Sequence, residues 1–344
     1  MMDSLRLTAL SGQGGCSAKI GQADLAEVFA GLISPAGGDL LVSAEGMDDA
    51  AVYRLTSDLA LVATTDFFPP PVDDPADYGA IATANALSDV YAMGASPLLL
   101  LNLVGFDLAV LGPAILRQIL EGGRAVAQEA GCAIAGGHSI RSQEPLFGCA
   151  VLGRVDPARL VTNSGARPGD RILLTKPLGT GVILNAHKQG VAPAPVLATA
   201  VATMRRLNRA AAESMVAAGA SAATDVTGFG LLGHAHNLAV ASGIRLQLRS
   251  QDLPLLPGAR DLAAAGHLPG GSRRNLELAR SRAAISEGIE PELLQLACDA
   301  QTSGGLLIAV NPAGAARIRS SADGVVEIGE ALPSVPGALP VELI

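Results

Sequence analysis

The sequence predicts a two-domain protein of the α+β class, and three observations support this prediction. The chain has 344 residues, of which 49% are hydrophobic, which is enough for two cores of ordinary size. Candidate strands and helices are mixed along the chain without the strict alternation of a parallel sheet. Chain-breaking residues gather at Asp156-Pro157 and at Arg167-Pro168-Gly169-Asp170, so we place the domain boundary near 155–168.

The elements expected before this boundary follow from apolar patterns and from the residues that interrupt them. Two apolar runs joined by Thr56-Ser57-Asp58 predict paired strands over 51–55 and 59–63. The proline-rich segment 69–75 excludes both a helix and a central strand. Gly94 is a candidate cap at the end of a helix. The other elements expected here are helices over 23–33, 77–93 and 113–130, strands over 98–103, 132–135 and 146–155, and a tight turn over 136–139.

After the boundary, an apolar run predicts a buried strand over 171–175, followed by a loop over 176–181. A long stretch of good helix formers then predicts one continuous helix over 195–218. Further strands are expected over 245–248, 306–310 and 325–328. No repeat of fixed period and no low-complexity tract is visible in this half or the other.

Composition excludes several classes of function. A formal net charge of −8 disfavours nonspecific binding to nucleic acid, which needs a basic face. The four cysteines form no C-x-x-C pair, so neither a zinc site nor a disulfide framework is indicated. The apolar stretch 98–111 contains Asn102 and Asp107 and is too short to cross a bilayer. We therefore expect a cytoplasmic protein with no membrane contact.

A thiol and an amine lie close together near the N-terminus, in the segment Gly14-Gly15-Cys16-Ser17-Ala18-Lys19. Lysine is rare in this chain, which has only Lys19, Lys176 and Lys188. A neighbouring ammonium lowers the pKa of a thiol, so we expect Cys16 to be a reactive thiolate. Flexible glycines allow a backbone to approach phosphate oxygens. An unstructured terminus with an incidental cysteine is the alternative interpretation.

Several acidic residues lie in apolar surroundings. A buried carboxylate is costly unless something compensates its charge, and Mg²⁺ with a phosphate is a common compensation. Asn85 and Asp89 are four residues apart, so both side chains leave one face of the helix expected there. Helix caps and strand ends remain the alternative for each single residue. The acidic residues in this group are Asp48, Asp49, Asp66, Asp89 and Asp225.

The glycine-rich motifs of this chain do not indicate a known type of nucleotide-binding site. Gly228-Phe229-Gly230-Leu231-Leu232-Gly233 matches G-x-G-x-x-G, but the preceding segment is short and polar, and the nearest later acid, Asp252, lies in a proline-flanked loop. A nicotinamide or flavin site is therefore disfavoured. No P-loop motif occurs, so any ATP site is of another kind. Gly136-Gly137-His138-Ser139 could present backbone amides to an anion, or it could be a plain turn.

Several longer motifs occur in order along nearly the full chain and resemble the selenophosphate synthetase (selenide, water dikinase) family. The most specific are Gly15-Cys16-Ser17-Ala18-Lys19, Asn85-Ala86-Leu87-Ser88-Asp89 and Thr224-Asp225-Val226-Thr227-Gly228-Phe229-Gly230. Two positions depart from the family pattern: Ala18 replaces a second cysteine found in many relatives, and Ala300 replaces a proline. Neither change removes a proposed ligand.

The resemblance implies the two-domain architecture of the aminoimidazole ribonucleotide synthetase superfamily, with a mixed sheet and helices in each domain. It implies a flexible glycine-rich catalytic segment over 1–20, an ATP- and Mg²⁺-binding domain over 21–157 and a C-terminal domain over 158–344. It further implies a homodimer that converts ATP, selenide and water to selenophosphate, AMP and phosphate.

The resemblance also assigns roles to individual residues. Cys16 and Lys19 are the expected catalytic residues. Asp49, Asp89 and Asp225 are the expected ligands of several Mg²⁺ ions. The expected ATP contacts are Lys19, Gly46, Met47, Asp48, Asp66, Asp89, Gly137, His138 and Ser139.

Two other functions remain open at this point. A thiamine-monophosphate kinase or a related synthetase on the same scaffold would share the aspartates without needing Cys16. A non-catalytic nucleotide-binding carrier of selenium or sulfur would use Cys16 without hydrolysing ATP.

Overall fold

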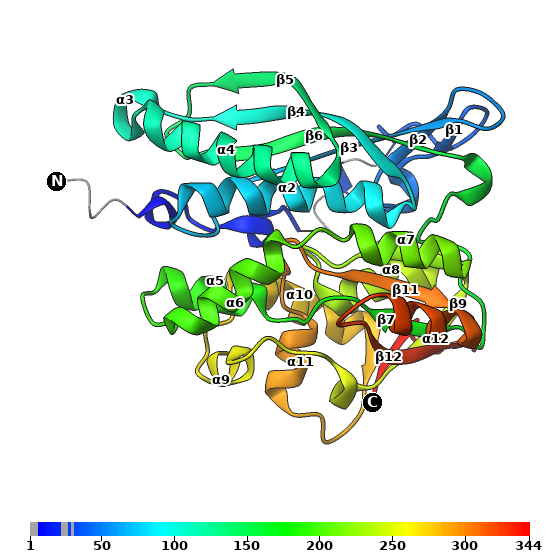
Figure 1. Cartoon of the computed structure of the whole chain (residues 1–344). Helices are drawn as coiled ribbons and strands as arrows, with labels where there is room; N and C mark the ends of the chain where they lie inside the picture. The colour runs from blue at the N-terminus through cyan, green and yellow to red at the C-terminus, as the bar shows by residue number, and fades with distance from the viewer. Residues whose placement is uncertain (1–5, 22–26, 29–30) are drawn as a thin grey trace.

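The computed structural model describes residues 6–21, 27–28 and 31–344, and the helix expected over 23–33 lies largely outside them. Within the described residues the chain forms two α+β halves stacked on one another (Figure 1). The predicted fold class is therefore confirmed.

The N-terminal half is built on a six-stranded mixed sheet in the order β1-β2-β3-β6-β4-β5, counted over the described residues. Helices α2 (Pro75–Ala92) and α4 (Pro113–Ala130) cover the face that looks toward the other half, and no helix among the described residues lies over the opposite face (Figure 1). The short helix α3 (Leu108–Leu111) precedes α4. The strands are β1 (Leu40–Val42), β2 (Ala51–Arg54), β3 (Ala60–Phe68), β4 (Ser96–Gly105), β5 (Ala133–Ile140) and β6 (Leu146–Val155).

Helices α2 and α4 pack unusually closely because glycines lie at their contact. A Cβ atom built on Gly79 would lie 1.8 Å from the backbone oxygen of Ile119, and one on Gly122 would lie 1.9 Å from that of Ala76. The close contact fixes α2 in place, and α2 carries Asn85, Ser88 and Asp89 of the site described below.

The C-terminal half is built on a seven-stranded sheet in the order β10-β13-β9-β12-β7-β11-β8, again counted over the described residues. Its strands are β7 (Arg171–Leu174), β8 (Ala222–Asp225), β9 (Ile244–Leu248), β10 (Ala283–Ile285), β11 (Leu306–Val310), β12 (Val326–Pro333) and β13 (Val341–Leu343). Its helices are α5 (Thr180–Lys188), α6 (Ala194–Arg205), α7 (Arg209–Ala218), α8 (Gly230–Ser242), α9 (Ala259–Ala264), α10 (Gly270–Arg282), α11 (Pro291–Ala297) and α12 (Pro312–Ser321).

Two expected elements were wrong. The helix expected over 195–218 is broken between α6 and α7, where Arg206 is extended and the buried side chain of Asn208 donates to Ser88 Oγ and the Gly304 oxygen, both at 2.8 Å. The turn expected over 136–139 is the second half of β5, because pairing with β4 continues to Ile140. Strand β8, which the sequence did not predict, ends at Asp225, and two residues separate it from the glycine motif at 228–233.

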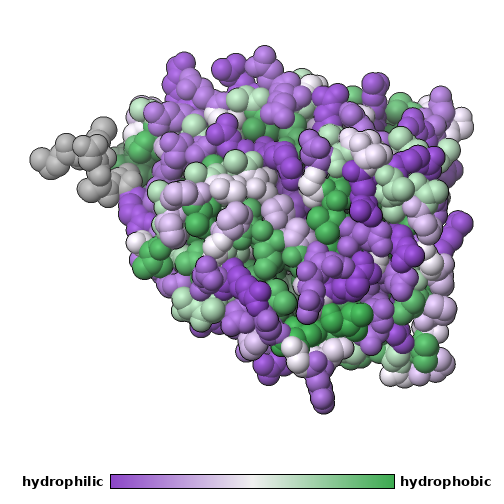
Figure 2. All heavy atoms as spheres, turned by 60° about the horizontal axis from the view of Figure 1, so that its bottom comes forward, coloured by the Kyte–Doolittle hydropathy of each residue, from purple (hydrophilic) through white to green (hydrophobic). Residues whose placement is uncertain are grey.

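The two halves share one of the apolar cores. That core contains Val90 of α2 together with Met215 of α7 and Ile308 of β11, so side chains from both sheets and the helices between them pack as one unit. On the face of the C-terminal half shown in Figure 2, hydrophilic and hydrophobic residues are interspersed. Among the described residues, no helix has the length and apolar character needed to span a bilayer.

Candidate active site

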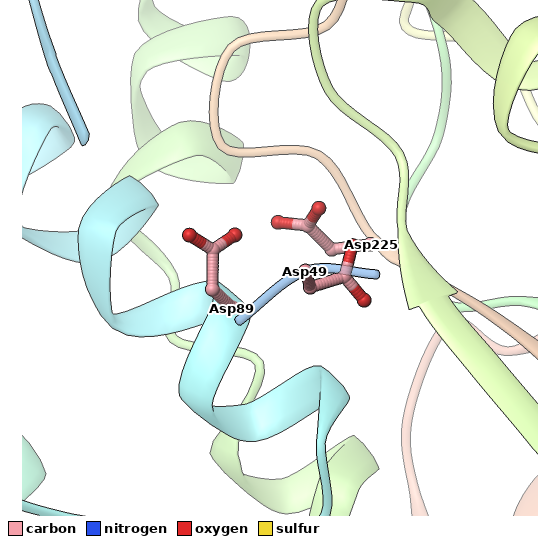
Figure 3. Close-up of side chains that lie close together, drawn as sticks. All are labelled: Asp49, Asp89 and Asp225. Atoms are coloured by element: carbon pink, nitrogen blue, oxygen red, sulfur yellow. The ribbon is translucent and has the colours of Figure 1, made fainter. Parts of the chain in front are cut away.

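Three aspartates from distant parts of the sequence converge between the two halves. Asp49 lies in the turn before β2, Asp89 in the last turn of α2, and Asp225 at the end of β8. Each offers a carboxylate oxygen, and these oxygens all lie within 4.8 Å of one another. Figure 3 shows the three side chains grouped around a common space. We refer to Asp49, Asp89 and Asp225 as the aspartate cluster.

A hydroxyl group supports each member of the aspartate cluster. Thr64 Oγ1 donates to Asp89 Oδ2 at 2.5 Å, and Thr224 Oγ1 donates to Asp49 Oδ1 at 2.8 Å across the two halves. Ser88 hydrogen-bonds to Asp225. The role of these hydroxyl residues was not predicted, since nothing in their local pattern separates them from ordinary strand and helix residues.

Two oxygens of the cluster remain free for a ligand. Asp49 Oδ2 and Asp225 Oδ2 are buried and have no hydrogen-bond partner among the described residues. Buried carboxylate oxygens without a partner are costly, so they are suited to bind a cation. A set of three carboxylates offers only hard oxygen ligands, which suit Mg²⁺. The residues present therefore fit a magnesium site.

The electrostatics of the aspartate cluster support the same interpretation. Burial, together with repulsion from Asp225, raises the pKa of Asp49 and that of Asp89 well above the ordinary aspartate value. Burial raises the pKa of Asp225 to about 6. The ionised cluster is thus poorly stabilised by the protein alone, and a divalent cation would supply the missing positive charge.

The N-terminal segment lies over this space and brings Cys16 and Lys19 to it. Cys16 is in the short 3-10 helix η2 (Gly15–Ala18), whose first residue donates its backbone N–H to the Pro69 oxygen at 3.0 Å. The backbone N–H of Cys16 donates to Thr302 Oγ1 at 3.0 Å. Lys19 Nζ lies 3.0 Å from a carboxylate oxygen of Asp66. We call residues 6–19 the arm.

The expectation that Cys16 is a thiolate is wrong in this conformation. The thiol is buried and donates to Asn85 Oδ1 at 3.3 Å. Burial raises the pKa of Cys16 to about 12, and the nearby Asp66 and Asp225 add to this rise against the opposing effect of Lys19. Sequence proximity to the lysine was visible, but the desolvation and the two carboxylates come from the folded chain.

Asn85 connects the arm to the strand that carries Asp66. Its amide nitrogen donates to Asp66 Oδ2, and its amide oxygen accepts from Cys16 Sγ and, at 2.8 Å, from the backbone N–H of Ser303. The four-residue spacing predicted that Asn85 and Asp89 share one helix face, but it indicated no role for Asn85. Thr302 and Ser303 were not predicted to take part in the site either.

Gly46, Met47 and Asp48 lie in one loop that Asn163 fastens. The Asn163 side chain donates to the oxygens of Gly46 at 2.9 Å and Met47 at 3.1 Å, while its backbone N–H donates to Asp48 Oδ1 at 3.1 Å. Burial raises the pKa of Asp48 to about 6. The loop leads directly into Asp49, so its anchoring positions a member of the aspartate cluster.

The structure does not bring Gly137, His138 and Ser139 to the aspartate cluster. They lie on the edge strand β5, and both β4 and β6 lie between β5 and the strand β3 that carries Asp66. Neighbouring strands are about 4.8 Å apart, so Gly137 is roughly 14 Å from Asp66 in the same row of the sheet. Within one chain, these residues cannot share a ligand contact with the aspartates except through an extended ligand.

Comparison with known protein families gives two matches that together cover most of the chain. Residues 47–155 match the N-terminal domain of AIR synthase related proteins, and residues 167–339 match the C-terminal domain of the same proteins. The division of the chain at 157/158 remains a prediction, and the two matches leave residues 156–166 between them.

Individual relatives are similar over nearly the whole length. The chain is 47% identical over 311 residues to "Selenide, water dikinase" of Caldanaerobacter subterraneus subsp. tengcongensis, covering 90% of each. It is 50% identical over 309 residues to the protein of that name in Myxococcus xanthus, covering 89% of this chain and 87% of the relative. A solved thiamine-monophosphate kinase from Stenotrophomonas maltophilia shares the fold, with a TM-score of 0.63 and 20% identity over 95% of this chain and 96% of that one.

Proposed function

Since this chain belongs to the selenide, water dikinase family, we propose that its aspartate cluster binds the Mg²⁺ through which ATP is held for reaction with selenide. The enzyme synthesises selenophosphate from selenide, with ATP and water as the other substrates and AMP and phosphate as the other products. The observation that carries the magnesium proposal is the convergence of three carboxylates with two unpartnered oxygens.

Mg²⁺ bound to Asp49, Asp89 and Asp225 would screen the phosphate charge, which otherwise repels hydroselenide, an anion near neutral pH. The protein's own part is to hold the three carboxylates at a fixed spacing by the hydroxyls of Thr64, Thr224 and Ser88. Because Asp49 and Asp89 come from one half and Asp225 from the other, the cluster forms only where the two halves meet.

Lys19 and Cys16 are proposed to act from the arm. The pKa of Lys19 is raised, mainly by Asp66 acting against the opposing effect of burial, so its ammonium stays charged and can pair with phosphate oxygens. Cys16 meets selenide as a neutral thiol while the arm lies over the site, and a neutral thiol does not repel an anion as a thiolate would. The docked arm also keeps water away from the transferring phosphoryl group.

The remaining nucleotide contacts are proposed in two groups. Gly46, Met47 and Asp48 lie beside the aspartate cluster, and Asp66 lies beside Lys19, so these four can reach a nucleotide held there. Gly137, His138 and Ser139 lie on the uncovered side of the molecule at the sheet edge. Their nucleotide role stays a prediction from the family resemblance.

We also propose that the enzyme is a homodimer and works in the cytoplasm. The face of the N-terminal sheet without helices exposes apolar side chains from three strands, and a second copy of the chain is an occupant that would cover them. These side chains are Phe67, Leu101 and Ile140, which the strand register places on that face. All four cysteines are free, and selenide itself survives only under reducing conditions, which favours a reducing compartment.

The alternatives kept open by the sequence now rank lower. The thiamine-monophosphate kinase likeness is 20% identical and carries the fold alone, whereas the dikinase relatives are 44–50% identical. A non-catalytic carrier would not be expected to keep the whole set of aspartates, Lys19 and Cys16 that the enzyme family uses.

Phosphorus-31 NMR of the reaction with ATP, Mg²⁺ and selenide, run without oxygen and with a reductant, tests this function. Wild-type protein is expected to give selenophosphate, AMP and phosphate in equal amounts. Lys19→Ala is expected to give no selenophosphate, because the ammonium group proposed to pair with the phosphates is lost. ADP with no selenophosphate from the wild type would contradict the function, and normal turnover by Lys19→Ala would contradict the role of Lys19.

A further inference from the structure

One carboxylate outside the aspartate cluster receives an unusual number of donors from the arm. Asp73 accepts from Arg6 Nε at 2.9 Å, from the backbone N–H of Thr8 at 2.9 Å and from Thr8 Oγ1 at 2.7 Å. His187 Nε2 lies 3.1 Å from the same carboxylate. These donors hold the pKa of Asp73 well below its usual range, so the group is charged at neutral pH.

The arm also forms hydrogen bonds with the C-terminal half. Arg6 donates to the backbone oxygens of His187 at 2.9 Å and Lys188 at 3.3 Å, at the end of α5. Lys188 Nζ donates to the Gly12 oxygen at 2.7 Å and also to the Ser11 oxygen. Arg6, Asp73 and His187 thus join the arm, the N-terminal half and the C-terminal half in one contact, which we call the latch.

The segment 69–73 connects the latch to the part of the arm that holds Cys16. Asp73 follows the segment Pro69-Pro70-Pro71, whose φ angles the proline rings fix. The arm runs along this segment, because Gly15 N–H donates to the Pro69 oxygen and Leu7 packs in a core with Phe68 and Val72. A rigid segment therefore connects the latch to the residue before Cys16, and release of the arm at Asp73 would loosen the cover over the thiol.

We propose that Asp73 is a positioning residue that holds the arm closed, so that Cys16 and Lys19 lie in place for phosphorylation of selenide. This inference rests on the proposed roles of Cys16 and Lys19, but the closure itself does not. The neighbouring Asp74 has a different task, since it caps α2 by accepting from the Asp77 N–H at 2.8 Å. Asp73 and Asp74 are adjacent and have the same side chain. The same substitution at Asp74 is therefore a matched control for a substitution at Asp73.

Alkylation of the cysteines tests the closure without any substrate. Wild type, Asp73→Asn and Asp74→Asn are treated with iodoacetamide, and the rate at each cysteine is followed by peptide mass analysis. Cys132, Cys149 and Cys298 are buried elsewhere in the fold and report general loosening. Asp73→Asn is expected to raise the rate at Cys16 about tenfold, since charged hydrogen bonds to the arm are weakened, with the other three unchanged. Asp74→Asn is expected to behave as wild type, since asparagine also caps helices.

Two results of the alkylation experiment would overturn the proposal: a wild-type rate at Cys16 in Asp73→Asn, or an equal rise at all four cysteines. Steady-state kinetics of selenophosphate formation tests whether closure of the arm by Asp73 supports catalysis. Asp73→Asn is expected to lower kcat more than it raises KM for ATP, with partial recovery in Asp73→Glu. Unchanged kcat in Asp73→Asn would reject the positioning role. Because the alkylation uses no substrate, its outcome does not depend on whether the enzyme makes selenophosphate.

Discussion

The ammonium group of Lys176 is buried near the active site and bonds only to backbone oxygens in the described residues. Lys176 Nζ donates to the oxygens of Arg206 at 2.6 Å and Ser303 at 2.9 Å. Burial, aided by the positive charge of Arg206, lowers the pKa of Lys176 from 10.5 to about 7. The lysine therefore loses its proton in the folded state at a pH where the unfolded chain still binds one.

This difference predicts a pH dependence of stability. Between pH 7 and 8.5 the unfolded state binds more protons at Lys176 than the folded state, so its contribution to the free energy of unfolding rises with pH. Relative to Lys176→Met, the wild type is expected to gain up to about 1.4 kcal/mol per pH unit in this range. Urea unfolding of both proteins at pH 7, 7.75 and 8.5 measures it. Parallel profiles for the two proteins would show that Lys176 does not titrate there.

At the scale of single residues, the sequence predicted which side chains are candidates for the active site. It did not predict their protonation states or their hydrogen-bond partners. The acidic residues were recognised because carboxylates in apolar surroundings need compensation. The charge state of Cys16 was predicted wrongly, because it depends on burial by the folded arm and on Asp66 and Asp225. The support from Thr64, Thr224 and Ser88 could not be predicted, since hydroxyl residues in strands and helices carry no local mark of their partners.

Helices α2 and α4 pack closely, and their contact depends on the absence of side chains at Gly79 and Gly122. Gly79→Ala is expected to destabilise the protein by about 3 kcal/mol, because the added Cβ would overlap the backbone of Ile119 and force the helices apart. Gly37→Ala is the matched control, since a Cβ there meets nothing within 4 Å. Chemical denaturation of both variants measures the effect. Equal stability of Gly79→Ala and wild type would contradict the packing account.

Individual elements were predicted well where the sequence punctuates them. Helix α4 has the expected bounds, because it begins at Pro113 and is capped by Gly131. Strand β6 also has the expected bounds, because chain-breaking residues follow it. The break between α6 and α7 was missed, because it depends on contacts of Asn208 with Ser88 and Gly304 that lie far away in the sequence. The second half of β5 was taken for a turn because paired glycines favour turns, whereas here Gly137 allows the close approach of Asn102 on β4.

The active site of the whole molecule exists only when both halves are in place. The aspartate cluster takes Asp49 and Asp89 from the first half and Asp225 from the second, and Thr224 reaches across to Asp49. Residue spacing alone could not have joined positions so far apart, and the sequence brought them together only through the family resemblance. The latch at Asp73 was not predicted, since it depends on the folded chain bringing Arg6 of the arm to the end of α5.

Nucleotide binding by Asp225→Asn tests the central claim most directly, because this substitution removes one charge from the cluster and keeps the shape of the side chain. Titration calorimetry with a non-hydrolysable ATP analogue is run with and without Mg²⁺, with circular dichroism to confirm folding. Wild type is expected to bind tightly only with Mg²⁺, and the variant to bind at least about tenfold more weakly under the same conditions. Equal affinity of the folded variant and the wild type in the presence of Mg²⁺ would contradict the assignment of the cluster as the magnesium site.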